Sequence, residues 1–353
     1  VAAGCDAGTD PDVVEAFDAE AALEDMQALE ASFGTTELAG FAALGGRTPF
    51  GPSPAGIDVI ANLGAPSAAD GGQAWAKDLA SRLIRAHDEL NDGPMAGPII
   101  SGWHRGTTFV YDPQSDDYQP DLTRTDAPET GVRFVIYEVD ASGVPIVESE
   151  IGYADLIDEG DNSAEDIVLR LIVVEQDSTL LDYRVTLDHD ATSGALTVLG
   201  FFAGDEAQLD FDIAVNANEV GDVTTLDITF DFGVEAHGLS VFGSLTGIED
   251  GNDDGPGRID ITMQNRRDTV RIQLEADGQG MGDGSVNVNG DVFATMTVAA
   301  GEEPVFLNAA GEPLSGVEIL VLVRIFDVVE DVFDFLEDIV DPVDELVLLG
   351  FIL

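Results

Sequence analysis

An acidic stretch near the middle of the chain has the spacing of a calcium-binding loop. Oxygen-bearing side chains alternate at Asp250, Asn252 and Asp254, and a glycine follows them. Calcium prefers such carboxylate and amide oxygens. The twelfth position, where a bidentate glutamate is expected, is Ile261, and the nearest carboxylate is Asp260. We therefore expect a calcium-binding β-hairpin loop formed by Asp250, Asn252, Asp254 and Asp260; the alternative is an ordinary acidic turn.

The residues that usually carry catalysis are sparse. The four histidines, at positions 87, 104, 189 and 237, stand apart from one another in the sequence. His189 lies between Asp188 and Asp190, but a turn histidine among acids is more often solvated than catalytic. The chain has no Gly-x-Ser-x-Gly, HExxH, Walker or CxxC motif. Carboxylates are so abundant that a pair of them does not identify a glycosidase, and we predict no enzymatic activity.

The first residues resemble the end of a bacterial lipoprotein signal. The chain begins Val1-Ala2-Ala3-Gly4-Cys5, so small residues precede a cysteine as they do at a lipid-attachment site. Ala2 stands where such signals usually have a bulky aliphatic residue. The resemblance implies a lipid on Cys5 and an extracellular or cell-envelope location; the alternative is an incidental thiol. Because Cys5 is the single cysteine, no intrachain disulfide can form.

The charge balance indicates a salty medium. The chain has 69 Asp and Glu against 14 Lys and Arg, a formal net charge of −55. Such self-repulsion destabilises a compact chain, and molar salt relieves it by shortening the Debye length to about 3 Å. We interpret this composition as halophilic; GC-rich codon usage is the alternative. Nucleic acid and anionic membranes are poor partners because they need clustered cations, and the densest cluster is Arg266, Arg267 and Arg271.

Two patterns divide the chain into three regions. Residues 1–100 show helical spacing around residues 11–33 and 73–90, with a long Gly/Ala/Pro-rich loop between them. Residues 101–326 alternate between apolar and polar, most clearly from Leu226 to Val234. Alternation predicts antiparallel strands with one buried face. Recurrent turn signals then predict on the order of ten strands joined as sequential hairpins.

Two strands break this alternation. Ile167–Val174 and Val317–Phe326 are apolar on both faces and are expected to be strands that lie centrally or under a helix. The third region, residues 327–353, begins with an amphipathic acidic helix at 327–340 and ends with an uncharged tail. We predict an α+β, β-dominated fold: a long antiparallel meander, as a curved sheet or open barrel, covered by the N-terminal helices and one C-terminal helix.

The apolar tail at residues 346–353 is the sequence feature on which the expected function mainly depends. Its large side chains, including Leu346, Leu348, Phe351 and Leu353, are costly to leave in water. The tail is too short to span a bilayer, and we expect no transmembrane span. It is expected to pack on its own β domain or on another protein subunit, from the same or a different chain.

We therefore expect a non-enzymatic structural or assembly protein of the cell exterior, either a surface component or an accessory subunit of a larger complex. One alternative is a carrier that binds an apolar ligand between sheet and helices. Another is a secreted hydrolase with an unrecognised site. The aromatic residues around positions 103–118 would suit a ligand site, although packing at a sheet edge explains them more simply.

Overall fold

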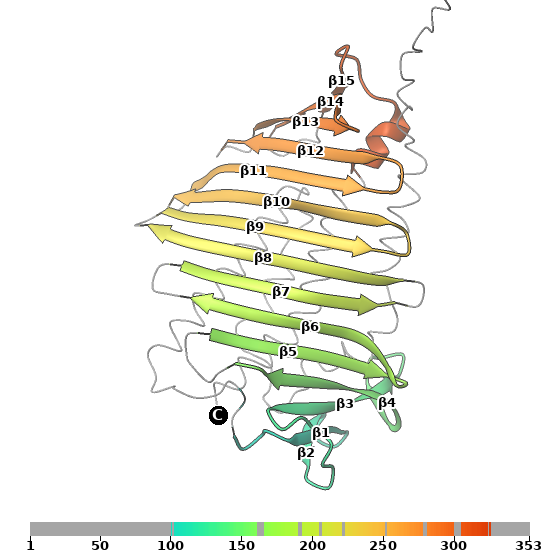
Figure 1. Cartoon of the computed structure of the whole chain (residues 1–353). Helices are drawn as coiled ribbons and strands as arrows, with labels where there is room; N and C mark the ends of the chain where they lie inside the picture. The colour runs from blue at the N-terminus through green and yellow to red at the C-terminus, as the bar shows by residue number, and fades with distance from the viewer. Residues whose placement is uncertain are drawn as a thin grey trace, which may run out of the picture.

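The computed structural model describes residues 100, 102–160, 166–189, 193–204, 207–220, 223–250, 253–277, 281–299, 305–323 and 325. These residues form one open sheet of 15 strands and a helical segment at 316–323 (Figure 1). The strands are β1 Thr107–Asp112, β2 Asp117–Asp121, β3 Gly131–Val139, β4 Pro145–Asp158, β5 Asp166–Glu175, β6 Ser178–His189, β7 Ser193–Ala203, β8 Gln208–Val220, β9 Val223–Val234, β10 Leu239–Asp250, β11 Asp253–Gln264, β12 Thr269–Ala276, β13 Gly282–Val288, β14 Asp291–Val298 and β15 Val305–Asn308.

The sheet is a meander over nearly its whole width. From β3 to β15, each strand pairs antiparallel with the next strand in the chain. The exception is β1, which pairs antiparallel with β2 and parallel with β3. The predicted antiparallel meander is confirmed, as an open sheet rather than a closed barrel. It has more strands than expected because short strands such as β15 carry too few residues for alternation to be recognised.

One face of the sheet holds the core, and we call it the inner face. In β8, Leu209, Phe211 and Ile213 are buried, whereas Asp210 and Asp212 between them are exposed. Phe211 is in register with Phe232 of β9, and Asp212 with Asp231, so each inner or outer row continues across strands. The opposite, outer face is mainly polar. β5 is an internal strand, as predicted for Ile167–Val174.

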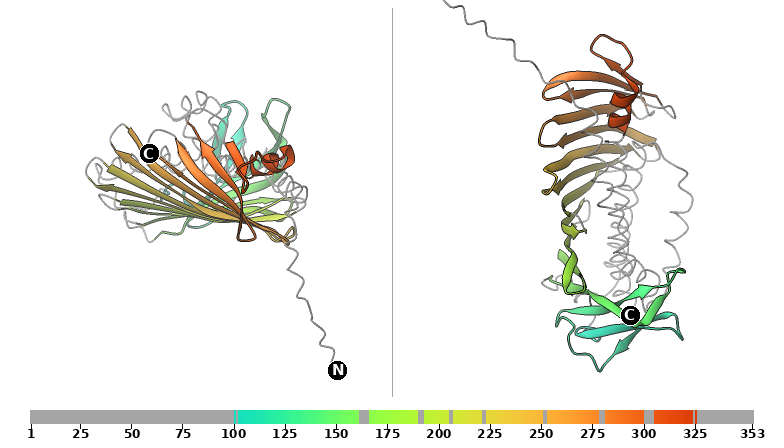
Figure 2. Two further views of the ribbon diagram at one scale, coloured as in Figure 1. Left: turned by 90° about the horizontal axis from the view of Figure 1, so that it is seen from above. Right: turned by 90° about the vertical axis from the view of Figure 1, so that its right-hand side faces the viewer.

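The sheet is curved, and the helical segment lies inside the curve (Figure 2). Glycines on the inner face permit close approach of neighbouring strands. A Cβ atom on Gly200 of β7 would lie 2.3 Å from the carbonyl oxygen of Asp182 and 2.4 Å from the Cβ of Tyr183. Gly200 stands in register between Tyr183 and Phe211, whose ring centroids are 6.3 Å apart. Because Gly200 has no Cβ, the Tyr183 and Phe211 rings can approach each other across this position of β7.

The expected strand at Val317–Phe326 is wrong, because residues 316–323 are helical. The helix begins with a capping box. The backbone N–H of Glu318 donates to Ser315 Oγ at 3.4 Å, and the N–H of Ser315 donates to Glu318 Oε2 at 2.8 Å. Val321, Leu322 and Ile325 are buried in the core, which is the spacing of one helical face. The predicted N-terminal helices and the helix at 327–340 lie outside the described residues.

Tight turns join the strands at two of the turn signals in the sequence, Asp140–Gly143 and Asn289–Gly290. Asp140 caps the β3–β4 turn, since its Oδ1 accepts bonds from the N–H groups of Ser142 and Val144 at 2.7 and 3.1 Å. Between β13 and β14, Asn289 and Gly290 have φ angles of 53° and 92°. Positive φ at both central positions is typical of the hairpin turn that Asn-Gly favours.

Both edges of the sheet are poorly suited to strand addition. At one edge, β2 has only five residues, and among them are two aspartates and Pro120, which has no N–H to donate. At the other edge, β15 has four residues. Its outer side is occupied by the returning chain, where Leu307 bridges Pro313 and the N–H of Asn308 donates to the carbonyl of Glu312 at 2.8 Å. Extension of this sheet by a neighbouring strand is therefore disfavoured at both ends.

Candidate interaction face

The outer face contains arginine side chains fixed between carboxylates, an arrangement that we call arginine clamps. Arg133 of β3 donates from Nε and one terminal nitrogen to the two oxygens of Asp155, each at 2.7 Å. Its other terminal nitrogen donates to Asp126 at 2.9 Å. The guanidinium carbon lies 3.6 Å from the ring centroid of Tyr153. A planar fork that bonds two acids and stacks on a ring is the geometry in which arginine cannot be replaced by lysine.

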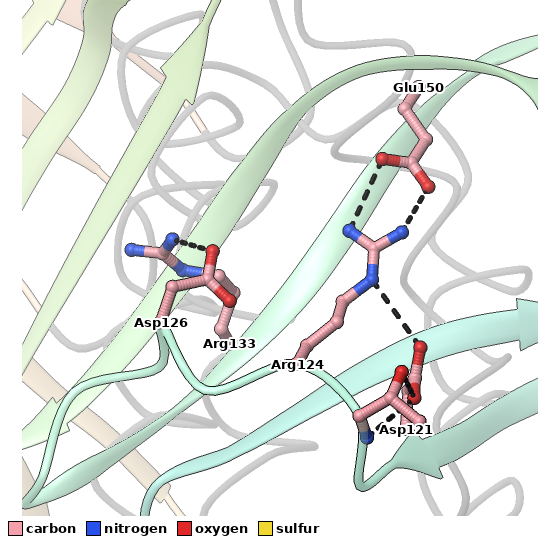
Figure 3. A network of polar contacts seen from close by, with 6 residues as sticks. Asp121, Arg124, Asp126, Arg133 and Glu150 are labelled. Carbon is pink, nitrogen blue, oxygen red and sulfur yellow. Dashed lines mark hydrogen bonds and ion pairs between the residues drawn. The ribbon is translucent and has the colours of Figure 1, made fainter.

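A second clamp holds the loop after β2 (Figure 3). Arg124 donates with both terminal nitrogens to Glu150 of β4, and its Nε lies 3.5 Å from Asp121. Beside it is an open depression of about 340 Å³. It is lined by Gly106, Thr107, Asp121, Leu122, Arg124, Thr125, Ala127 and Glu129. Because Arg124 is neutralised by Glu150 and Asp121, this depression is not a strong anion site.

A third clamp connects β5 and β6. Arg170 bonds both oxygens of Asp182, at 2.8 and 2.6 Å, and lies 3.7 Å from Glu159. Arg184 reaches the same Glu159 at 2.6 Å. Glu159 thus offsets the repulsion between two arginines that face each other in register. Together the clamps fix the outer surface of this end of the sheet.

Burial and ion pairing shift the pKa values of the clamp residues in different ways. Burial raises the pKa of Asp155, although the bonds from Arg133 partly oppose this. The bonds to Asp155 in turn raise the pKa of Arg133, so the guanidinium stays charged. In β11, hydrogen bonds from Arg271 lower the pKa of Asp260. The lowered pKa keeps the Asp260 carboxylate charged at neutral pH, which maintains its ion pair with Arg271.

Glu175, at the end of β5, differs from the clamp acids. Its Oε1 is buried and has no hydrogen-bond partner among the described residues. Burial raises the pKa of this carboxyl group, and no compensating bond is present in that part of the chain. Glu175 is in register with Gly152 and Ser178 on the neighbouring strands. Burial of this carboxyl group destabilises the fold locally, and its ionisation increases the free-energy cost.

The predicted calcium ligands lie on the β10–β11 hairpin. Asp250 and Asp254 fall at its tip, Asn252 lies outside the described residues, and Asp260 is on the outer face of β11. The Asp260 carboxylate accepts bonds from Arg271 at 2.8 and 2.7 Å and from Gln273 at 3.0 Å. A cation at Asp260 would therefore compete with a guanidinium. In the described ranges, no three His, Cys, Asp or Glu side chains are grouped as metal ligands. Calcium binding at the tip of the β10–β11 hairpin stays a prediction.

The aromatic residues near the first strands form part of the core. Phe109, Tyr111 and Tyr118 are 2%, 5% and 1% exposed, whereas Trp103 is 92% exposed and does not join them. The Tyr118 hydroxyl donates to the Val135 carbonyl at 2.9 Å. Packing at the sheet edge, the simpler of the two interpretations, therefore accounts for the three buried rings.

The remaining predicted residues are widely separated or not described. The rings of His104 and Phe109 form a T-shaped contact with centroids 5.9 Å apart, and His237 is in the turn between β9 and β10. Cys5 and the tail residues Leu346, Leu348, Phe351 and Leu353 lie outside the described residues. The clamps were missed from sequence because Arg133 and Asp155 become neighbours only through strand register.

Comparison with protein-family models, with curated proteins and with solved structures gives no match. Within the described ranges, no helix is long and apolar enough to cross a membrane. The geometry of the outer face is therefore the main basis for an inference about function.

Proposed function

We propose that this protein is a non-enzymatic structural or assembly protein of the cell exterior, acting as a surface component or an accessory subunit. The observation that carries the proposal is the outer face itself. It is a mainly polar surface that extends across the sheet. Arginine clamps fix its side chains on β3 to β6, and the Arg271–Asp260 ion pair connects β11 and β12. A rigid, wide surface suits repeated contact with other subunits better than it suits enclosure of a small substrate.

Contacts through the face are favoured over contacts through the edges. Pro120 and two aspartates block β2, and the returning chain at Pro313 covers β15. A partner that added a strand to either edge would meet missing donors or like charges. The apolar segment at 346–353 adds a second proposed contact, through large side chains that lose free energy when exposed.

The proposed location rests on two sequence features. The Ala2-Ala3-Gly4-Cys5 pattern is compatible with a lipid anchor on Cys5, and the net charge of −55 with a medium of high salt. Mass spectrometry of native material tests the anchor. A chain that starts at Cys5 and carries added lipid mass supports it, whereas an unmodified Val1 terminus refutes it.

Assembly is tested by the mass of the full chain in molar KCl, measured by sedimentation over a range of protein concentrations. A separate sample is extracted with organic solvent to measure bound lipid. We expect a defined oligomer and no extractable lipid. A protein that stays monomeric at all concentrations would contradict the proposal, and a monomer that yields extractable lipid would favour the carrier function instead. Deletion of residues 343–353 is expected to reduce the oligomer while leaving the far-UV circular dichroism of the sheet unchanged.

A further inference from the structure

The centre of the outer face carries acids without the arginines that neutralise them elsewhere. The sequence contains no lysine or arginine between Arg184 and Arg258, a stretch that includes β7 to β10. Within it, Asp212 of β8 and Asp231 of β9 are exposed and face each other directly in register. Like charges in that position destabilise neighbouring strands. A cation bound to this part of the sheet would therefore relieve the repulsion and stabilise the paired strands.

Apolar side chains stand on both sides of the two aspartates. Leu199 of β7 is in register with Asp212, and Phe242 of β10 with Asp231. Their exposed fractions are 51% and 38%. We call these four residues the acidic row. The row offers two carboxylates and an aromatic ring on one exposed surface, which are the groups that surround Arg133 in its clamp. It has the composition of an arginine clamp that lacks its arginine.

A suitable arginine stands on the turn between β11 and β12. Arg266 is exposed, and its terminal nitrogen donates to the carbonyl of Ala236 at 2.8 Å. Its stem lies against Gly238, where an added Cβ would be 2.7 Å from the arginine Nε. The guanidinium is thus held in place, and its bonded acceptor is a neutral carbonyl, whereas the clamp arginines bond carboxylates. Its five N–H donors leave capacity for a carboxylate.

We propose that the acidic row of one copy binds Arg266 of a second copy, and that the contact is reciprocal. β9 and β11 run in the same direction in the meander, so the turns that follow them lie at the same end of the sheet. Asp231 is near that end of β9, which finishes at Val234. Two copies related by a two-fold axis at this end can therefore make the contact twice, with Arg266 of each copy bound to the acidic row of the other. This inference rests on the proposed function as an assembling protein.

The charge of the chain sets the conditions for this contact. Two copies of net charge −55 repel each other in dilute buffer. At molar salt the Debye length falls to about 3 Å, so the long-range repulsion vanishes while hydrogen-bonded ion pairs in direct contact persist. Burial of Leu199 and Phe242 adds an apolar term that salt does not weaken. We therefore expect a dimer that forms in molar KCl and dissociates in dilute buffer.

The test is sedimentation equilibrium of the full chain in molar KCl, with charge-exchanged variants. Asp231→Arg and Arg266→Asp are each expected to raise the dimer dissociation constant by at least about tenfold, since each removes two ion pairs per dimer and adds repulsion. The double variant, which exchanges the two charges, is expected to restore it. Asp283→Arg is the matched control, because it makes the same charge change at an exposed position of β13.

Each outcome separates this contact from the broader function. If the wild-type chain stays monomeric in molar KCl, both the contact and the assembly function are wrong. If the wild type associates but both single variants associate equally well, the contact is wrong and assembly uses another surface. An Asp231→Arg effect no larger than that of Asp283→Arg would also overturn the contact. Circular dichroism verifies that each variant keeps its sheet.

Discussion

Replacement of Gly200 by alanine tests why the sheet can curve. The new Cβ would fall 2.3 Å from the Asp182 carbonyl oxygen and 2.4 Å from the Tyr183 Cβ, both closer than van der Waals contact permits. The strands must separate or the Tyr183 and Phe211 rings must move. Overpacking of this kind costs about 1–3 kcal/mol. Gly194→Ala in the same strand is the control, because nothing lies within 4 Å of its Cβ position. This control should be neutral, or stabilising by up to about 1 kcal/mol, because alanine reduces the entropy of the unfolded chain.

The assay is urea denaturation in molar KCl, followed by far-UV circular dichroism. With an m-value near 3 kcal/mol/M, the Gly200→Ala midpoint should fall by about 0.3–1 M, while the Gly194→Ala midpoint stays level or rises. Gly243→Ala should behave like Gly200→Ala, since its Cβ would lie 2.3 Å from the Asp260 carbonyl oxygen. Equal midpoints for the Gly200 and Gly194 variants would refute the reasoning, because the close approach of the strands would then have no energetic consequence.

Four further results are expected. Since burial raises the pKa of Glu175, its ionisation destabilises the folded chain as pH rises; Glu175→Gln should be more stable than the wild type at neutral pH, and the difference should vanish in acid, as measured by urea titrations across pH. Arg133→Lys should lose about 1–3 kcal/mol with the fork to Asp155, whereas Arg184→Lys, at a half-exposed pair, should lose less than about 1 kcal/mol in the same assay. The melting temperature should climb from dilute buffer to molar KCl, and a flat profile would contradict halophilic adaptation. If the β10–β11 tip binds calcium, chelation should lower the melting temperature and Asp254→Ala should remove that sensitivity.

The fold was predictable where side-chain alternation extends over many residues. The pattern from Leu226 to Val234 predicts β9, and the Asn289-Gly290 pair predicts the turn between β13 and β14. The segment at 317–326 was assigned wrongly because a run of apolar residues fits a buried strand and a buried helix equally well. Ser315 and Glu318, three residues apart, were the missed signal, since this spacing is typical of a helix N-terminus.

The candidate interaction face was not predictable from the sequence. Arg133 and Asp155 are 22 residues apart, and Arg170 and Asp182 are 12 apart. Which acid meets which arginine depends on strand register and on bulges such as the one between Ile136 and Tyr137. With 69 acids in the chain, pattern alone gives no basis for choosing the partner of any arginine.

The meander also has a consequence for how the molecule forms. From β4 onward each strand bonds to its predecessor, so almost every pairing joins neighbours in the chain and closes a short loop. A chain that becomes available gradually can extend the sheet one hairpin at a time, with each finished strand serving as the template for the next. The parallel pairing of β1 with β3 interrupts this order, since it requires β2 to be passed over. Folding that proceeds as a zipper from β3 toward β15 would leave a single growing edge, which is blunted only when β15 is covered by the residues that follow it.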